Sequence, residues 1–433
     1  MTISTNKLGI LNLFVMLVAV CFEGPVFNAP AYLGLSELYA PVFFLATVVL
    51  NRSRVGELAR SKKVILSALM LILVMVPRAQ QASQFDALVA CKLTYLFCVA
   101  ASIALTVDSP MKLRIVIYTI PICSLASSLV IVAGEYLNPD GAYEAFFLYR
   151  NNPYWGETRQ LMGFSKTPNN LALNLVPLLI YTLAQALLGN TGRQLEIARI
   201  YDAIFVTALL LVIVLTQSKS LFLGLSLMIF LIVAQGRSSK KIQKPLLFSL
   251  IAIYFGLVHF VFLKSSDFSL KMVGEFLGSP HPIFQLGDFE IFISQYLLLK
   301  KIALHAVLEN PVFGIGLGNF GGYAENFGTA NLEKLHTSNP LPHSLYFWIF
   351  AEGGLLIGIV FSVLAFGCIK KAFSCVSSMN QGLLSAGHVA LQAGMLFFLI
   401  EAVSLDVQYN RYFWILIGAS FAISASWYRA NSK

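Results

Sequence analysis

The stretch NPLPHSLYFWIFAEGGLLIG, residues 339–358, decides how this sequence is interpreted. It opens an apolar run that we expect to form a helix over 343–366, long enough to cross a bilayer, since about 20 residues are needed. A histidine, His343, stands at the start of the run, and a glutamate, Glu352, stands within it. Ionisable side chains are costly inside a membrane and are often functional there, so both positions need an explanation.

The whole chain has the composition of a polytopic membrane protein. It has 433 residues, of which 57% are hydrophobic and 12% charged, whereas soluble domains have roughly 45–50% apolar and about 25% charged residues. The apolar runs are too long for barrel strands and do not alternate, so we predict an all-α fold. We place about twelve transmembrane helices, near 8–22, 31–50, 64–77, 87–107, 113–133, 167–188, 198–216, 220–235, 245–263, 343–366, 384–404 and 412–428.

The distribution of Lys and Arg predicts the orientation of these helices. Most basic residues fall in segments on the same side as the N-terminus, among them 51–63 and 236–244. We therefore predict a multi-pass protein with both termini in the cytoplasm. The formal net charge of +9 follows from this bias, and we predict no nucleic-acid partner.

Two outer segments, 134–166 and 264–342, are much longer than a connection requires. Connections beyond about 12–15 residues usually have a structure of their own or a function. Within the longer segment, residues 294–310 have the apolar pattern of an amphipathic helix, and the glycines that follow predict a turn. We treat the chain as one membrane domain, 1–433, with a helical cap on its outer side.

Three motifs appear in order along the chain: GFSKTPNNLALNL at 163–175, NPVFGIGLGNF at 310–320 and PHSLYFWIFAEGGLLIG at 342–358. Together they resemble the O-antigen ligase and Wzy-type polymerase superfamily of bacterial envelope glycan assembly. The motifs cover a small part of the chain and do not separate the subfamilies.

The resemblance implies a GT-C-like glycosyltransferase of the bacterial inner membrane, active on the periplasmic face. Such an enzyme takes a glycan from an undecaprenyl-diphosphate-linked donor. A polymerase of O-antigen or exopolysaccharide gives it to another lipid-linked glycan, and a ligase gives it to lipid A–core. The long, cation-bearing outer segments favour the polymerase, with the ligase as the alternative. The resemblance implies no cofactor, and the six cysteines form no C-x-x-C pair, so we expect no metal site either.

His343 is the candidate catalytic residue. Transfer needs a base for the acceptor hydroxyl and positive charge for the departing diphosphate. Pro342 suits the first position of a helix, and the positive end of that helix favours a neutral imidazole that can accept a proton. The alternative is an ordinary polar residue at the membrane boundary. Glu352 is nine residues further on, on the opposite face of the helix, so we expect it to make a polar contact between helices.

Five cations are candidates for contacts with the diphosphate or the glycan: Arg150, Arg159, Lys219, Lys300 and Lys301. Lys219 stands where the family usually carries an arginine, and lysine keeps the charge but loses the bidentate geometry. Lys300 and Lys301 follow a position where the family arginine is missing, which weakens the ligase assignment. Each cation is alternatively a solvated or interfacial side chain.

A small-anion transporter is the more distant alternative. Transporters of this kind carry polar residues near the bilayer midplane on paired, broken helices, with inverted repeats. The polar residues here crowd the outer side, and no repeat is visible, although Lys92, Asp202 and Glu401 lie within the predicted spans. A non-catalytic scaffold for glycan export is a third reading of the same pattern.

Overall fold

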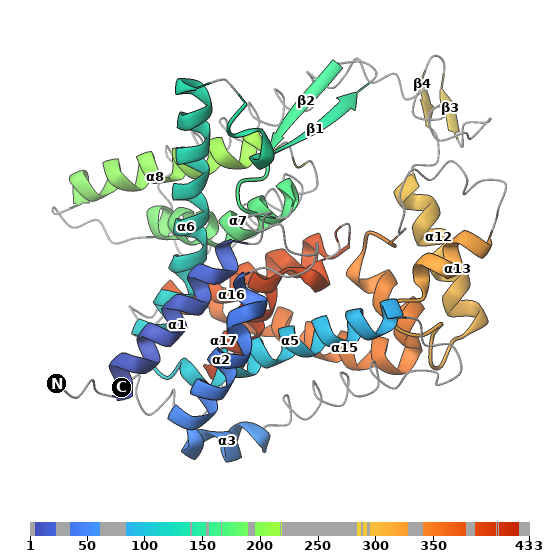
Figure 1. The fold of residues 1–433 in the computed structure, drawn as a ribbon, viewed down its shortest axis with the longest axis horizontal. Coiled ribbons are helices and arrows are strands. Elements are labelled where there is room, and N and C mark those ends of the chain that lie inside the picture. Colours follow the sequence, from blue (N-terminus) through green and yellow to red (C-terminus); the bar gives the residue numbers. More distant parts are fainter. Residues whose placement is uncertain are drawn as a thin grey trace.

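A computed structural model describes most of the chain. The described residues are 5–22, 35–60, 84–138, 141–152, 156–165, 167–188, 195–216, 218, 284–286, 289–291, 295–327, 341–377, 386–403, 405 and 407–423. They are mostly helical (Figure 1). The helices are α1 (Thr5–Cys21), α2 (Leu35–Leu50), α3 (Arg52–Ala59), α5 (Gln84–Thr106), α6 (Pro110–Leu137), α7 (Pro168–Leu188), α8 (Leu195–Leu215), α12 (Gln295–Glu309), α13 (Phe320–Phe327), α15 (Leu345–Ser377), α16 (Ala386–Glu401) and α17 (Arg411–Ala422), with the short 3-10 helices η1 (Glu144–Phe146) and η3 (Val407–Tyr409).

Helices occupy the positions of the predicted spans, except for 64–77, 220–235 and 245–263, which lie outside the described residues. Two described helical stretches, Pro110–Leu137 and Leu345–Gly367, are long and apolar enough to cross a membrane. The number of spans and their orientation stay predictions.

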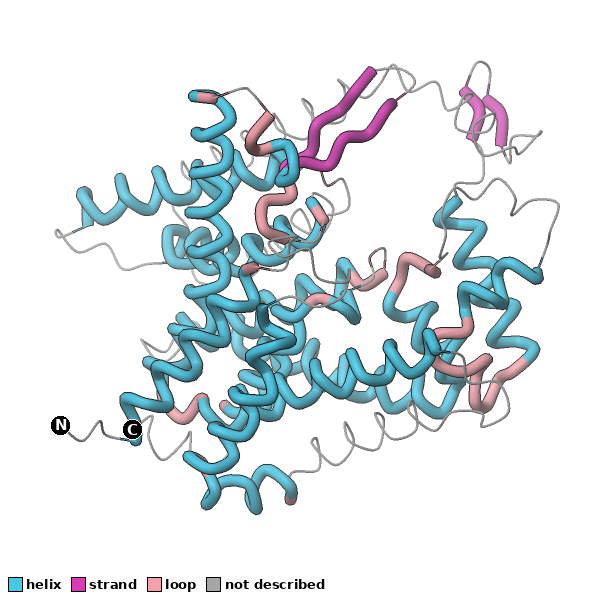
Figure 2. The backbone as a smooth tube through the Cα atoms, viewed as in Figure 1, coloured by secondary structure: helices cyan, strands magenta, loops and turns pink. Residues whose placement is uncertain are grey.

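The prediction of an all-α fold needs one correction. The described chain also contains two antiparallel hairpins, drawn in magenta in Figure 2, and both fall in the predicted outer segments. β1 (Phe147–Asn152) pairs with β2 (Gly156–Leu161), and β3 (Phe284–Leu286) pairs with β4 (Phe289–Ile291). The two strands of a hairpin pair the backbone groups that face each other, and the groups on the outer edges can bond to water, so a loop in contact with water can form strands within a helical protein.

Most of the described helices share one large apolar core, and α12 and α13 pack in a second, smaller cluster. Extended helix-to-helix packing joins α5 to α17, α7 to α16, and α15 to α16. Tyr412, one of the largest fully buried side chains, donates a hydrogen bond from its hydroxyl to the Ile117 carbonyl at 3.1 Å and so ties α17 to α6. This core fixes the ends of α15, α16 and α17, where the candidate site lies.

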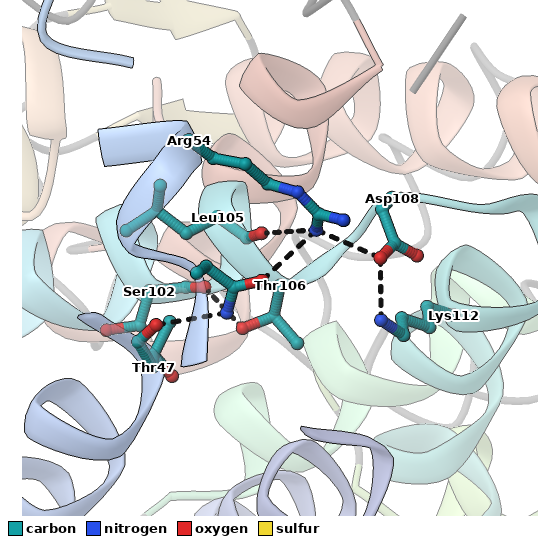
Figure 3. A network of polar contacts seen from close by, with 8 residues as sticks. Thr47, Arg54, Ser102, Leu105, Thr106, Asp108 and Lys112 are labelled. Atoms are coloured by element: carbon teal, nitrogen blue, oxygen red, sulfur yellow. Dashed lines mark hydrogen bonds and ion pairs between the residues drawn. The ribbon is translucent and has the colours of Figure 1, made fainter. Parts of the chain in front are cut away.

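A cluster of charges holds α3 to the connection between α5 and α6 (Figure 3). The Asp108 carboxylate accepts hydrogen bonds from Arg54 at 2.9 Å and from Lys112 at 2.8 Å. Arg54 also donates to the Leu105 carbonyl at 3.3 Å. Burial raises the pKa of Asp108, but the hydrogen bonds and charges of Lys112 and Arg54 outweigh this effect and hold the pKa below its usual value.

Replacing Asp108 with asparagine is expected to destabilise the protein by about 2 kcal/mol near neutral pH, because hydrogen bonds to a charged group are lost and Lys112 stays buried. A lowered carboxyl pKa gives stability that is present above the unfolded pKa of about 4 and is lost as the pH falls through the folded value. The melting temperature of the detergent-solubilised protein, measured from pH 7 down to pH 3, checks both points. Arg52→Gln, an exposed neighbour, serves as the control, and an unchanged melting temperature for Asp108→Asn would contradict the prediction.

Candidate active site

His343 lies in an uncommon backbone conformation. It is the only non-glycine residue with a positive φ in the described part of the chain, with φ of 48°. Left-handed backbone is rare outside glycine, although histidine adopts it more often than most residues, and strained backbone tends to cluster at functional sites. The prediction that Pro342 occupies the first helical position is wrong, because α15 begins at Leu345. His343 therefore lies just before the helix, with a partly exposed side chain.

The start of α15 is fixed to the end of α16. The Ser344 hydroxyl donates to the Ala402 carbonyl at 3.1 Å, and the Leu345 backbone N–H donates to the same carbonyl at 2.9 Å. The Ser344 carbonyl in turn accepts a hydrogen bond from the backbone N–H of Trp348 at 2.9 Å, which closes the first turn of the helix. The residue after His343 is thus held from both sides, which fixes the backbone next to His343 at the contact between two helices.

Helix α15 is broken nine residues after it begins. Gly354 has φ of 69° and ψ of −174°, which is outside helical geometry. At the break, the carbonyls of Ala351 and Glu352 accept hydrogen bonds from the backbone N–H groups of Ile315 at 2.9 Å and Gly316 at 3.1 Å. The open end of the first half of α15 is therefore satisfied by a loop from elsewhere in the chain.

The second half of α15 is satisfied by the same loop. The Leu355 N–H donates to the Pro311 carbonyl at 2.7 Å, and the Leu356 N–H lies 3.4 Å from the Val312 carbonyl. We call this interlock of residues 310–320 with 351–356 the joint. It unites two of the three sequence motifs in one structural unit.

The glycines of the loop provide the turn that the sequence predicts. Gly314, Gly316 and Gly318 all have positive φ, at 68°, 93° and 78°. A side chain at Gly314 would also collide with the Glu352 backbone. These glycines allow the loop to pass through the break in α15, which confirms their interpretation as turn residues.

Glu352 makes a structural contact, as the sequence favoured. The residue is 3% exposed, and its carboxylate accepts from the backbone N–H of Gly318 at 2.8 Å and of Phe320 at 3.2 Å. Phe320 is the first residue of α13, so the negative charge caps the positive end of that helix. Glu352 thus holds the cap to the membrane helix.

Replacing Glu352 with glutamine is expected to cost about 2 kcal/mol of stability, because the amide oxygen can accept only one of the two bonds while its NH₂ group faces the other N–H. Glu325→Gln, at an exposed position of α13, should change little. Thermal unfolding of both purified variants checks the prediction. Equal melting temperatures for the two variants would show that the carboxylate does not fix the cap.

Arg159 is already engaged by the protein. It extends from β2 to the Glu135 carboxylate at 2.6 Å, and its guanidinium lies 4.1 Å from the centroid of the Phe147 ring. The hydrogen bond to Glu135 raises the pKa of Arg159. The ion pair ties the hairpin to the end of α6, so the structural role of Arg159 is seen directly, and its contact with substrate stays a prediction.

The other predicted cations lie on separate elements. Arg150 is in β1, where its backbone pairs with Thr158, and Lys219 lies outside the described residues. Lys300 and Lys301 lie on α12, partly buried and exposed respectively. Figure 1 shows β1 and β2 beside α6 and well separated from α12. The structure therefore does not gather the four candidates that it describes at one point.

Helix α12 confirms the amphipathic pattern predicted for 294–310. Its buried stripe packs against α15 and α13 and consists of Leu299, Ile302, Ala303 and Ala306. The spacing of three and four residues is that of one helical face. Lys301 lies on the exposed side of this helix.

Sequence reasoning missed a group of polar and aromatic side chains next to the start of α15. The Lys92 ammonium lies 4.3 Å from the centroid of the Tyr409 ring, and Tyr409 packs against Trp348 with ring centroids 6.2 Å apart. Glu401 and Arg411 are buried near the ends of α16 and α17. The ionisable residues within predicted spans were the available signal, but their sequence positions gave no indication that they lie near His343. Among the described residues, no group of three His, Cys, Asp or Glu could hold a metal ion.

Comparison with known proteins bears on the same elements. A comparison with curated proteins finds no match. A family model described as O-antigen ligase matches residues 203–362, a range that contains the loop of the joint, His343 and the first part of α15. The chain is therefore similar to the O-antigen ligase family over residues 203–362, the part that contains two of its three motifs.

Proposed function

We propose that the protein is an inner-membrane glycosyltransferase that moves a glycan from undecaprenyl diphosphate to an acceptor on the periplasmic face, as a polymerase of O-antigen or exopolysaccharide. The observation that carries the proposal is the joint. The family match spans NPVFGIGLGNF and the His343 motif, and the two are bonded together through the break in α15. Direct hydrogen bonds between the two motifs support a common function for them.

In the proposed reaction, the acceptor hydroxyl attacks the anomeric carbon of the lipid-linked glycan. The bond between that carbon and the diphosphate oxygen breaks, and undecaprenyl diphosphate leaves. His343 takes the hydroxyl proton, which is the task of a general base. The fixed position of Ser344 and Leu345 on α16 supports this role, because a base must be held within hydrogen-bond reach of its proton.

The joint favours an enzyme over a small-anion transporter. In transporters with broken helices, the half-helix ends are left to bind ions and substrates. Here the carbonyls of Ala351 and Glu352 and the N–H groups of Leu355 and Leu356 are taken up by the protein's own loop. The backbone groups at the break therefore bond to the loop of the cap, which supports a structural role for the break.

An O-antigen ligase is the second candidate, favoured by the description of the matching family. Reconstitution of the purified protein in liposomes with a lipid-linked glycan, with and without lipid A–core, tests both. Longer lipid-linked glycan without core indicates a polymerase, and glycan attached to core only when core is supplied indicates a ligase. Absence of both products, with the glycans of a deletion strain unchanged on a gel, would overturn the proposal.

A further inference from the structure

The two halves of α15 differ in what surrounds them. In the first half, residues 345–353, every residue is buried or half-buried, so protein covers most of its surface. In the second half, exposed apolar residues recur at every third or fourth position, which is the spacing of one helical face. These residues are Leu355, Ile359, Val363 and Phe366. On a helix that is long and apolar enough to cross a membrane, an exposed face of this kind marks a surface that contacts lipid.

The same apolar surface continues onto the loop of the joint. The Leu355 N–H donates to the Pro311 carbonyl at 2.7 Å, so the loop backbone lies directly beside the start of the second half of α15. Val312 and Phe313, the next two residues of the loop, are 52% and 67% exposed. The exposed apolar surface therefore extends from the membrane helix to the cap.

Helix α12, which lies beside α15 (Figure 1), extends this surface further. Its buried stripe packs against α15 and α13, but the helix also exposes Leu304 and Leu308, the latter by 68%. Lys301 precedes them on the exposed side, at the spacing of three and four residues that places side chains on one face. Leucines with a lysine at their border are typical of a helix at a membrane interface, where the ammonium group reaches the lipid headgroups. We call Leu304, Leu308, Val312 and Phe313 the apolar edge of the cap.

Two polar side chains of α12 lie against α13. The Glu309 carboxylate accepts a hydrogen bond from the Tyr323 hydroxyl at 2.7 Å, and the His305 ring lies 4.8 Å from that of Phe327. The cap itself therefore engages these two groups. A helix on a water-facing surface presents polar side chains outward, whereas α12 presents two leucines there.

The break bends α15 sharply. The rings of Tyr346 and Phe361 lie 5.8 Å apart, although two residues separated by fifteen positions are about 22 Å apart along a straight helix. The Phe350 ring likewise lies where a Cβ of Gly358 would be. The first half therefore turns back toward the second half, and the two do not form one straight span.

We propose that the apolar edge of the cap rests in the outer leaflet of the bilayer, so that the membrane surface passes through the joint. Its side chains then reach about 5–10 Å into the boundary between headgroups and acyl chains. The span of α15 begins at the break instead of at His343, and residues 355–377 suffice to cross the hydrocarbon, which takes about 20 residues. This inference does not depend on the proposed glycan transfer, because it rests only on the exposed surface and on the contacts of the joint.

Tryptophan fluorescence of the full-length protein in liposomes tests the proposal. Phe313→Trp and Leu308→Trp each add one indole to the four tryptophans of the chain, at exposed positions where substitutions usually cost little stability. Phosphatidylcholine brominated on its acyl chains is expected to abolish the added emission of both variants, and acrylamide in the water is expected to leave it unchanged. Glu325→Trp, at an exposed position of α13, is the matched control and should respond to acrylamide alone.

Val363→Trp is the control for depth, because it lies on the exposed face of α15. Its emission should be quenched most by bromine deep in the acyl chains, and that of Phe313→Trp by bromine near the headgroups. Quenching of Phe313→Trp and Leu308→Trp by acrylamide alone would place the apolar edge in water and overturn the proposal. Protection from both quenchers would show that protein, such as a second copy of the chain, covers the edge, and this result would overturn it as well.

Discussion

Replacing His343 with asparagine is expected to lower the turnover of glycan transfer by about 100-fold or more, because a positioned general base contributes about 10²–10⁴-fold to such a step. Asparagine is the appropriate replacement, because it tolerates the left-handed backbone that His343 adopts, with φ of 48°. Alanine would combine the loss of the imidazole with backbone strain. The rate is measured at saturating donor and acceptor with the purified variant in liposomes.

His305 offers a matched control for this experiment. It lies on α12, and its ring packs 4.8 Å from that of Phe327, so His305→Asn should leave the turnover within about twofold of the parent, as expected for substitutions away from the reacting groups. If His343→Asn kept its turnover and lost only affinity for the acceptor, His343 would be a binding residue. If neither value changed, the proposed base would be wrong.

The parts of this fold that follow from local sequence could be predicted. The apolar runs marked the positions of α6 and α15, because the length of such a run has to match the thickness of the bilayer. The stripe on α12 followed from a spacing of three and four residues. The turn at Gly314, Gly316 and Gly318 followed from the conformations that glycine permits.

The joint could not be predicted, because its causes lie far apart in the chain. Gly353 and Gly354 within an apolar run are consistent with an unbroken helix. The break becomes favourable only because Pro311, Ile315 and Gly316, some forty residues earlier, supply the hydrogen-bond partners. Because the sequence predicts an unbroken helix, it also gave no indication of the partners of Glu352, which are backbone N–H groups of the cap.

Sequence reasoning predicted one residue of the candidate site and did not predict the side chains around it. His343 was visible because a histidine at a membrane boundary is unusual. Lys92, Trp348 and Tyr409 come from three separate parts of the chain, and only the packing of α5 with η3 and α15 brings them together. Arg159 was predicted to contact the diphosphate or the glycan, or else to be a solvated side chain, but its ion pair with Glu135 depends on the hairpin, which the sequence did not reveal.

Replacing Gly354 with alanine is expected to destabilise the protein by more than about 3 kcal/mol, because the substitution causes both backbone strain and overpacking. With φ of 69° and ψ of −174°, Gly354 occupies a region that only glycine adopts readily. A methyl group there would also lie 2.5 Å from the Gly314 nitrogen and against the Val312 carbonyl. Folded yield and melting temperature after detergent extraction measure the effect, and normal values would mean that the break is dispensable.

Gly367→Ala is the control on the same helix, because a methyl group there meets no atom within 4 Å. It should be neutral or stabilising by up to about 1 kcal/mol, since alanine favours a helix more than glycine does. Gly314→Ala should be as harmful as Gly354→Ala, because its methyl group meets the Glu352 backbone from the other side of the joint. Once one substitution has separated the loop from α15, the second has little left to disrupt. The double variant should therefore lose much less than the sum of the two single losses, the sign of two residues that act in one contact.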